Sequence, residues 1–490
     1  MATTYNNPAF TGFFRPTRFE ADIYDCEVYG EIPHDLTGTL YRLQPDPEFA
    51  PKAAGDYPLQ GDGHLSMFRF VGGGHVDFRS RYVQTARLAA DRKAYANLFG
   101  VYRNRYSDDP KVRSLSPAAA NTNLVWHGGK LLALDEDGAP TAVDPNTLKT
   151  IGPWTFGGKL TSRTFGSHPK VDPKTGEMIA VAAEAKGELT PDIAVYTVSA
   201  KGQITKEVWL KAPYVGMVHD IAITPKHVII PITGFTSSAD RLKAGKPHWG
   251  WDAKLPTYVA VLPRGGTAKD VRWFKGPSRY AIHTLNAVDD GNSVVLTLPV
   301  SNANPDPMYP NIDDSPVTGA GAEPSIRKWT FDMSGSGDGF KEEVVFAGSG
   351  FARIDERYTG QPARYAFKGF ADPSKPFDEA KGGNLKGRVV NSYQKVDLTT
   401  GQAQSFFVGD VQGLQEAVFV PRSANAAEGD GYLIGVVNNY GARKSDVVIV
   451  DTMAMEKGAV ATIKLPFRLR PGTHAVWAPL ADIPFKTFSA

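Results

Sequence analysis

Apolar positions along the chain occur in short runs that turn residues interrupt. The segments MFRFVGGGHVDFRSRYV (67–83), DIAVYTVSAKGQITKEVWL (192–210) and GYLIGVVNNYGARKSDVVIVD (431–451) each read as two strands around a glycine-containing or polar turn. This pattern is typical of β-hairpins. The 49 Gly, 36 Pro, 19 Tyr and 26 Phe also favour many strands and tight turns over long helices. We therefore expect an all-β protein.

One short pattern recurs along the chain: a strand that ends in an apolar residue and aspartate, followed by a turn. It occurs at Val143-Asp144, Val171-Asp172, Phe331-Asp332, Val396-Asp397 and Val450-Asp451. Loose repeats of strand, turn and strand over most of 490 residues suit a β-propeller. The repeats have no strict period and lack the WD signature of one propeller class. A pair of β-sandwich domains is therefore the alternative.

The segment 302–326, NANPDPMYPNIDDSPVTGAGAEPSI, is rich in Pro, Asp and Gly and interrupts the strand pattern. Its composition predicts a long irregular loop. Such a loop is either a solvated excursion or a cap over a pocket. Met308 and Tyr309 favour the cap, because apolar side chains of this size gain by covering a cavity.

Charge and cysteine content exclude several classes of partner. The 54 Lys and Arg nearly balance the 52 Asp and Glu, and no long basic run occurs. Neither nucleic acid nor an anionic membrane is therefore the expected partner. Cys26 is the only cysteine, which rules out an internal disulfide. The N-terminus has no signal-peptide pattern and no segment is apolar enough to span a membrane, so we expect a soluble cytoplasmic protein.

Four histidines lie in short blocks whose contexts suit metal binding. The blocks are SHPKVDPKTG (167–176), MVHDIAIT (217–224), IHTLNAVDDG (282–291) and PGTHAVWAP (471–479), with His168, His219, His283 and His474. A lone histidine beside apolar residues is more often a core or surface residue than a ligand. Their wide separation excludes a local cluster, so they form one site only if the fold brings them together.

These blocks, with GDGHLSMFRF (61–70), LDEDG (134–138) and QEAVFVPR (415–422), resemble the carotenoid cleavage oxygenase family. The segment FGVYRNRYSDDP (99–110) and the ANTN at 120–123 most resemble the bacterial branch that includes lignostilbene dioxygenases and isoeugenol monooxygenase. The resemblance covers nearly the whole chain. It implies a single domain over residues 1–490, a seven-bladed β-propeller with irregular loops capping one face, and an axial non-haem Fe(II) held by the four histidines.

The resemblance also implies acids behind the metal ligands. A ligating imidazole usually donates its other N–H to a carboxylate or carbonyl. Glu136 and Glu416 match two family glutamates and would support His219 and His474. The third family glutamate is replaced here by Gly350. His283 must then use water, a backbone carbonyl or another acid, and we expect this chain to retain iron less firmly than its relatives.

Three further residues match the substrate side of the family's site. Tyr102 matches a tyrosine that holds the substrate hydroxyl, and Asp135 stands where relatives of the lignostilbene type have a lysine. An aspartate there would repel a phenolate but accept a hydrogen bond from a neutral phenol; the plainer interpretation is a solvent-facing acid. Thr122 matches a threonine beside the open metal position, or simply caps a turn. Leu59 replaces an aromatic residue, which leaves one ring fewer for stacking.

The predicted activity is therefore O2-dependent cleavage of the alkene of a phenylpropenoid or stilbene-type phenolic, giving an aromatic aldehyde. Four neutral imidazoles leave up to two of six octahedral positions on the metal for O2 or water. Cleavage of an apocarotenoid is the second hypothesis. A propeller that only binds partners, with a degraded metal site, is the third. Oligomeric state is open, with a homodimer among the options.

Overall fold

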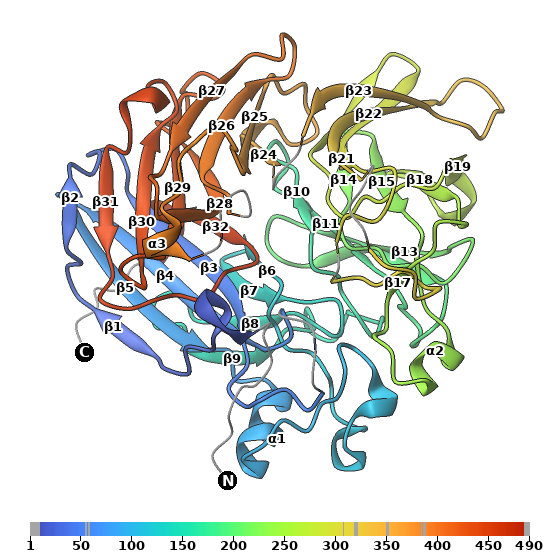
Figure 1. The fold of residues 1–490 in the computed structure, drawn as a ribbon. Helices are drawn as coiled ribbons and strands as arrows, with labels where there is room; N and C mark the ends of the chain where they lie inside the picture. The colour runs from blue at the N-terminus through green and yellow to red at the C-terminus, as the bar shows by residue number, and fades with distance from the viewer. Residues whose placement is uncertain are drawn as a thin grey trace.

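The computed structural model describes residues 10–53, 56, 59–306, 308–317, 322–348, 352–383, 385 and 389–484. Within these residues, seven antiparallel sheets of four or five strands are arranged around a central axis (Figure 1). The prediction of a seven-bladed β-propeller is confirmed, and the alternative of two β-sandwiches is wrong. We number the sheets as blades 1 to 7 in the order in which they follow one another around the ring.

Blades 2 to 6 are each built from strands that lie in one stretch of the chain. Blade 4 also carries a two-stranded hairpin, β16 (Phe235–Thr236) and β17 (Gly250–Trp251), inserted between its second and third strands. The strands of these blades are β6 (Asn123–His127), β7 (Lys130–Leu134), β8 (Thr141–Val143) and β9 (Thr150–Pro153) in blade 2; β10 (Lys170–Val171), β11 (Met178–Ala182), β12 (Asp192–Val198) and β13 (Ile204–Lys211) in blade 3; β14 (Ala222–Ile223), β15 (His227–Ile232), β18 (Thr257–Pro263) and β19 (Arg272–Gly276) in blade 4; β20 (Asn286–Asp290), β21 (Ser293–Val300), β22 (Ser325–Asp332) and β23 (Lys341–Ala347) in blade 5; β24 (Ala352–Ile354), β25 (Tyr365–Phe370), β26 (Ser392–Asp397) and β27 (Ala403–Phe407) in blade 6.

The two ends of the chain close the ring by exchanging strands. Blade 1 combines N-terminal strands with the last strand of the chain, and blade 7 takes an N-terminal strand at its outer edge. Closure of this kind ties the two ends of the chain into shared blades, and a propeller leaves only short sheet edges. The strands are β32 (Ala475–Pro479), β3 (Gly38–Asp46), β4 (Asp62–Gly72), β5 (His75–Tyr82) and β1 (Ala21–Ile23) in blade 1, and β28 (Gln412–Pro421), β29 (Gly431–Asn439), β30 (Lys444–Asp451), β31 (Ala461–Lys464) and β2 (Val28–Gly30) in blade 7.

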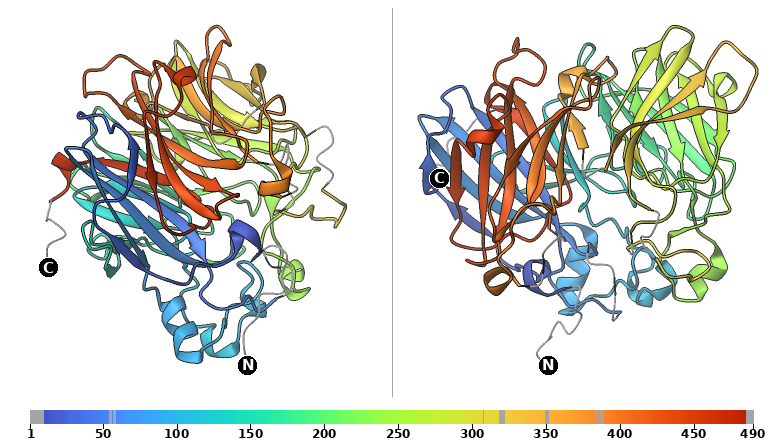
Figure 2. Two further views of the ribbon diagram at one scale, coloured as in Figure 1. Left: turned by 60° about the vertical axis from the view of Figure 1, so that its left-hand side comes forward. Right: turned by 45° about the horizontal axis from the view of Figure 1, so that its top comes forward.

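Helices are few and short. The α-helices are α1 (Ala86–Ala94), α2 (Ala239–Lys243) and α3 (Glu379–Gly382), and the 3-10 turns are η2 (Gly12–Phe14), η3 (Arg105–Ser107), η4 (Pro110–Val112), η5 (Ala268–Asp270), η6 (Glu356–Tyr358), η7 (Met455–Lys457) and η8 (Leu480–Asp482). The segments around α1 and α2 lie on one side of the propeller in both views of Figure 2. Asn104 joins the two segments by donating to the carbonyls of Leu242 and Lys246. No helix among the described residues is long and apolar enough to cross a membrane.

The core consists of apolar layers between neighbouring blades. Leu40 and Phe68 of blade 1 pack with Ile434 and Ile449 of blade 7, for example. Similar layers separate the other pairs of blades. Because both faces of most blades are covered, inner strands such as β11 are buried along their whole length. This packing fixes how the axial ends of the blades converge.

The repeated aspartate pattern has a local physical cause. In each of the five copies, an aspartate Oδ1 accepts a backbone N–H two residues further along, which closes an Asx turn. The turns are made by Asp144, Asp172, Asp332, Asp397 and Asp451. Four of the five join the last two strands of a blade in sequence order. The repeat therefore marks real hairpins of the propeller.

The irregular excursion is somewhat shorter than the sequence predicts, because Ser325 and Ile326 already belong to β22. Pro307 and residues 318–321 lie outside the described part of the chain. The remaining segment packs against the β16–β17 hairpin, with Trp251 N donating to Pro310 O and Ile312 N donating to Trp251 O. This packing holds Tyr309 in a buried position.

Candidate metal centre

All four predicted histidines lie just before the edge strand of a blade. His168 precedes β10, His219 precedes β14, His283 precedes β20 and His474 precedes β32. These edge strands face the axis of the ring (Figure 1). The propeller therefore brings together residues from blades 3, 4, 5 and 1 that are far apart in the sequence.

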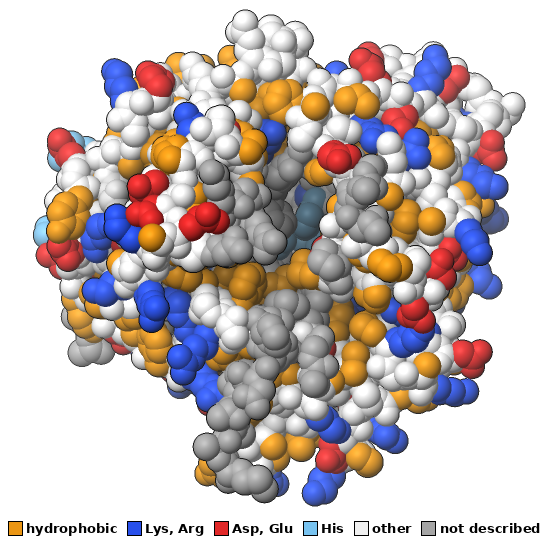
Figure 3. Space-filling model, viewed as in Figure 1, with side chains coloured by type: hydrophobic (Ala, Val, Ile, Leu, Met, Phe, Trp, Pro, Cys, Tyr) orange, Lys and Arg blue, Asp and Glu red, His pale blue; other side chains and the backbone are white. Residues whose placement is uncertain are grey.

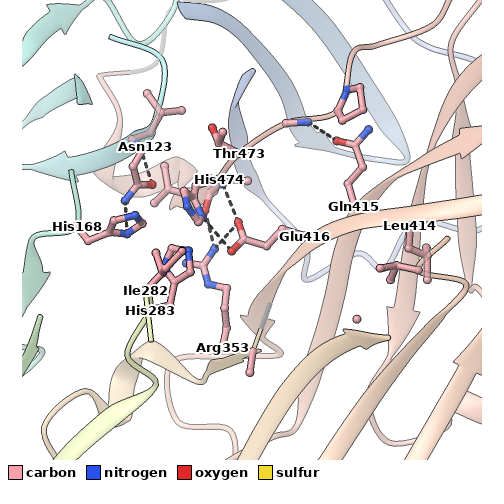
Figure 4. A pocket seen from close by; sticks show the side chains of 18 of the residues that line it. Asn123, His168, Ile282, His283, Arg353, Leu414, Gln415, Glu416, Thr473 and His474 are labelled. Carbon is pink, nitrogen blue, oxygen red and sulfur yellow. Dashed lines mark hydrogen bonds and ion pairs between the residues drawn. The ribbon is translucent and has the colours of Figure 1, made fainter. Parts of the chain in front are cut away.

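The four imidazoles form one compact cluster. Their ligand nitrogens all lie within 4.8 Å of one another, and the Nε2 atoms of His168 and His219 are 3.1 Å apart. Metal–nitrogen bonds of roughly 2.1 Å place neighbouring ligand atoms about 3.0 Å apart and opposite ones about 4.2 Å apart. The cluster is thus of the size needed to hold one metal ion. Figure 4 shows His168, His283 and His474 converging in the pocket.

Two of the histidines contact the glutamates that the sequence assigned to them. Nδ1 of His219 donates to Glu136, and Nδ1 of His474 lies 3.1 Å from Glu416 Oε1 (Figure 4). Burial disfavours the charged form of both glutamates, but the neighbouring histidines and arginines outweigh burial and lower each pKa to about 2. Both carboxylates are therefore ionised and accept from Nδ1, which leaves Nε2 directed at the cluster centre.

Each of these glutamates also contacts an arginine. Nη1 of Arg103 lies 2.9 Å from Glu136, and Nη1 of Arg353 lies 3.5 Å from Glu416. Arg353 is held in place by donating to the Ala475 carbonyl as well. The buried negative charges are thus paired, as a carboxylate in the interior must be.

The other two histidines have different partners. Gly350, the position at which the family glutamate is missing, lies outside the described residues. Nδ1 of His283 instead lies 3.6 Å from Oδ2 of Asp220. Nδ1 of His168 lies 3.3 Å from the Asn123 side-chain amide. Burial lowers the pKa of His168 well below its usual value and that of His283 to about 4, the latter against the opposing effect of Asp220. Both rings are therefore neutral at pH 7, as a metal ligand requires.

A large cavity reaches the cluster from the surface. It has a volume of about 2440 Å³, and His168, His283 and His474 line its wall. Figure 3 shows a hollow near the middle of one face with histidine side chains at its depth. His219 borders a much smaller space beside Met217 and Ile282.

Aromatic side chains form a cluster, which we call the aromatic wall, directly beside the histidines. Its buried members are Met217, Phe235, Trp249, Trp251, Tyr280 and Tyr309, with Tyr102, Val215 and Ile282 packed against them. Met217 lies two residues before His219, and Ile282 directly precedes His283. Tyr309 of the irregular loop contacts Phe235 at a centroid distance of 5.2 Å. The loop thus contributes one residue to the aromatic wall.

Tyr102, Thr122 and Asp135 lie together around a small cavity of about 40 Å³, and Glu136 also lines it. Asp135 is 6% exposed, which contradicts a solvent-facing acid. Its two oxygens accept the backbone N–H groups of Ala120 and Asp137. Burial and the neighbouring Asp137 raise the pKa of Asp135 to about 6. The substrate roles of all three residues remain predictions.

Several residues around the centre were not anticipated from the sequence: Asp220, Lys170, Arg103 and Arg353. Asp220 directly follows His219, and Lys170 lies two residues after His168. The available sequence signal for Asp220 and Lys170 was that they lie within the histidine blocks. The contacts that they make run between blades, however, and no local spacing indicates them.

Comparisons with known proteins agree with this architecture. The family model for RPE65, retinal pigment epithelial membrane protein, matches residues 14–479. Isoeugenol monooxygenase of Pseudomonas nitroreducens is 42% identical over 97% of this chain and 98% of its own. Lignostilbene-α,β-dioxygenase isozyme III of Sphingomonas paucimobilis is 39% identical over 99% of both chains. The crystal structure of Pseudomonas brassicacearum lignostilbene dioxygenase superposes with a TM-score of 0.93 at 39% identity, covering 97% of this chain and 99% of that one.

The propeller, its four axial histidines and these relatives define the class of protein as a β-propeller oxygenase. The chain belongs to the RPE65 family of carotenoid cleavage oxygenases. The resemblance identified from the sequence is therefore confirmed.

Proposed function

We propose that this protein is an Fe(II)-dependent oxygenase that uses O2 to cleave the exocyclic double bond of a phenylpropenoid or stilbene-type phenolic, yielding an aromatic aldehyde. The observation that carries the proposal is the convergence of His168, His219, His283 and His474 at the axis. The names of relatives 39–42% identical over nearly the whole chain supply the substrate class.

His168, His219, His283 and His474 would hold the metal. Four neutral nitrogen donors suit a borderline cation such as Fe(II) and add no negative charge to it. When bound, Fe(II) would supply the site at which O2 is activated for reaction with the alkene. Glu136 and Glu416 hold the Nδ1 protons of their histidines and so keep each Nε2 directed inward.

The aromatic wall would bind and orient the substrate ring. Ile282 and Met217 place apolar surface next to the ligand histidines, and Tyr280 lines the large cavity. Stacking against such rings holds a planar alkene in one orientation and excludes water from the reacting bond. The large cavity gives a ligand of this size a route from the surface.

Tyr102 would hold the substrate's phenolic hydroxyl, with Thr122 beside the metal. Burial raises the pKa of Tyr102 well above its usual value, so the phenol stays protonated and is able to donate. Asp135 lines the same cavity, but its oxygens are already engaged by backbone amides. We therefore assign Asp135 a supporting role, in which a neutral phenol is tolerated and a phenolate is repelled.

The proposal is tested by O2 consumption and product analysis of iron-loaded protein with isoeugenol, 4-vinylguaiacol, a hydroxystilbene and an apocarotenal. We expect O2 uptake and aldehyde formation with at least one of the three aromatic substrates. Turnover of the apocarotenal alone would instead establish the second hypothesis. Binding of no stoichiometric metal would support the third, a non-catalytic scaffold. Incorporation of label from 18O2 into both products would distinguish dioxygenase from monooxygenase chemistry.

The name of the isoeugenol monooxygenase relative supports the expectation of a small-molecule substrate. The cytoplasmic location, the homodimer and the absence of a nucleic-acid partner stay predictions.

A further inference from the structure

Three carboxylates around the candidate metal centre share one arrangement. Each carboxylate lies between the Nδ1 atom of a histidine and the side chain of a lysine or arginine. Glu136 lies between His219 and Arg103, and Glu416 lies between His474 and Arg353. The third carboxylate, Asp220, lies between His283 and Lys170.

Asp220 is the most buried of the three carboxylates, with a side chain only 3% exposed. Its Oδ1 accepts the backbone N–H of Ile221 at 2.7 Å and lies 2.8 Å from Nζ of Lys170. Its Oδ2 accepts the backbone N–H of Thr284 at 2.9 Å and faces Nδ1 of His283. Because Thr284 directly follows His283, the carboxylate contacts both the backbone and the ring of that block.

The position of Asp220 in the chain links two metal ligands. It directly follows His219, and its backbone forms a β-bridge with His168. Lys170, which balances its charge, lies two residues after His168. The position of the carboxylate that faces His283 is therefore fixed by residues of the His168 and His219 blocks. A rigid anion of this kind orients an imidazole more precisely than a mobile water.

The Nδ1–Oδ2 distance of 3.6 Å exceeds that of an ordinary hydrogen bond. His283 is also the most exposed of the three paired histidines, at 26% against 11% for His219 and His474. Binding of Nε2 to a metal leaves the proton on Nδ1, and Oδ2 of Asp220 is the carboxylate oxygen that faces it.

We propose that Asp220, balanced by Lys170, is the positioning residue for His283, the role that Glu136 and Glu416 have for their own histidines. Asp220 holds the Nδ1 proton and thereby directs Nε2 at the metal. This inference rests on the metal centre of the proposed function. In this arrangement, a residue from blade 4 supports a metal-binding histidine from blade 5.

The test is metal binding, measured by titrating the metal-free protein with Co²⁺ and recording the cobalt absorption spectrum. Asp220→Asn keeps the size of the side chain but turns an N–H₂ group toward Nδ1 or Lys170. We expect it to weaken Co²⁺ affinity about 10- to 100-fold and to alter the spectrum, as Glu416→Gln should. Asp220→Glu, which restores the charge, should recover part of the affinity.

Asp289→Asn is the matched control. Asp289 accepts from Nδ1 of His227 at 2.8 Å in a similarly buried pair that borders a different pocket. Its substitution should leave Co²⁺ affinity and the cobalt spectrum unchanged. Thermal unfolding of each metal-free variant reports separately whether the fold is intact.

Lys170→Met provides a second variant that keeps the carboxylate and its two backbone partners. We expect a smaller loss of Co²⁺ affinity in the same direction. Wild-type affinity and spectrum in both Asp220→Asn and Lys170→Met, with Glu416→Gln impaired, would overturn the inference and leave the proposed function standing. Failure of the wild-type protein to bind Co²⁺ or Fe²⁺ would overturn both.

Discussion

The candidate site depends on which atom of each side chain faces which neighbour. Nδ1 of His219 and Nδ1 of His474 face glutamates that arginines neutralise, and this directs Nε2 at the cluster centre. The same residues without these partners would rotate, and a rotated imidazole binds less tightly. The orientation of each metal-binding imidazole thus depends on hydrogen-bond contacts of about 3 Å.

Tyr102→Phe should reduce kcat/KM for a 4-hydroxylated substrate and leave a 4-methoxy analogue unaffected. The variant removes only the hydroxyl, and a single neutral hydrogen bond contributes roughly 0.5 to 1.5 kcal/mol, or about 2- to 10-fold. Steady-state kinetics with the two substrates checks this. An equal loss with both would show that Tyr102 acts through packing alone.

Asp135→Asn should change the pH dependence of stability. The pKa of Asp135 is raised from 3.8 to about 6 in the folded protein, chiefly by burial and then by Asp137. Folded protein therefore binds this proton more tightly than the unfolded chain, so the free energy of unfolding falls as pH rises between about 4 and 6. The variant should lose this component, on the order of 1 to 3 kcal/mol. Urea unfolding across this pH range is the measurement, and identical slopes for both proteins would contradict it.

At the scale of strands, the exchange of chain ends decides where His474 lies. β32 follows His474 directly and pairs with β3 along its whole length. The Trp477 indole of β32 packs over Gly38 of β3, where a side chain would occupy the same space. The close approach of these two strands therefore requires glycine.

Gly38→Ala should destabilise the protein by roughly 1 to 3 kcal/mol, because the new methyl group overlaps the Trp477 ring and β32 must shift. Metal affinity should also fall, since the shift carries His474 with it. Gly265→Ala, at a position with open space around it, is the control and should have little effect. Urea unfolding and Co²⁺ titration test both variants; unchanged stability in Gly38→Ala would show that the ring moves without cost.

The predictable part of the strand architecture was local. Each Asp in the repeated pattern closes a turn with amides two residues away, so short stretches of sequence already indicated the hairpins. The short edge strand β14, of two residues, carries no comparable signal. It forms because the ring holds it against the longer β15.

For the whole molecule, a metal at the axis would tie together blades 1, 3, 4 and 5. Those blades contribute one histidine each, and the apolar layers among the described residues lie between neighbouring blades. Binding to the folded state alone stabilises it by mass action.

Removal of metal by a chelator should therefore lower Tm, and restoring Fe²⁺ or Co²⁺ at about 100 times Kd should return about 2.7 kcal/mol of stability. Differential scanning calorimetry of the metal-free and reloaded protein checks this. His474→Ala is the control, in which addition of metal should give a smaller shift. If added metal does not change the Tm of the wild-type protein, the histidine cluster does not bind metal in the folded state.

The sequence by itself determined the β-hairpins, the turns after the repeated aspartates, the four histidine blocks and the two glutamates, because each is recognisable within a few residues or by its family block. The tertiary structure alone decided that Asp220 faces His283, that Lys170, Arg103 and Arg353 neutralise the carboxylates, and that Asp135 is buried. Most of these contacts join residues of different blades. Their geometry follows from the packing of the layers between blades, which no local spacing encodes.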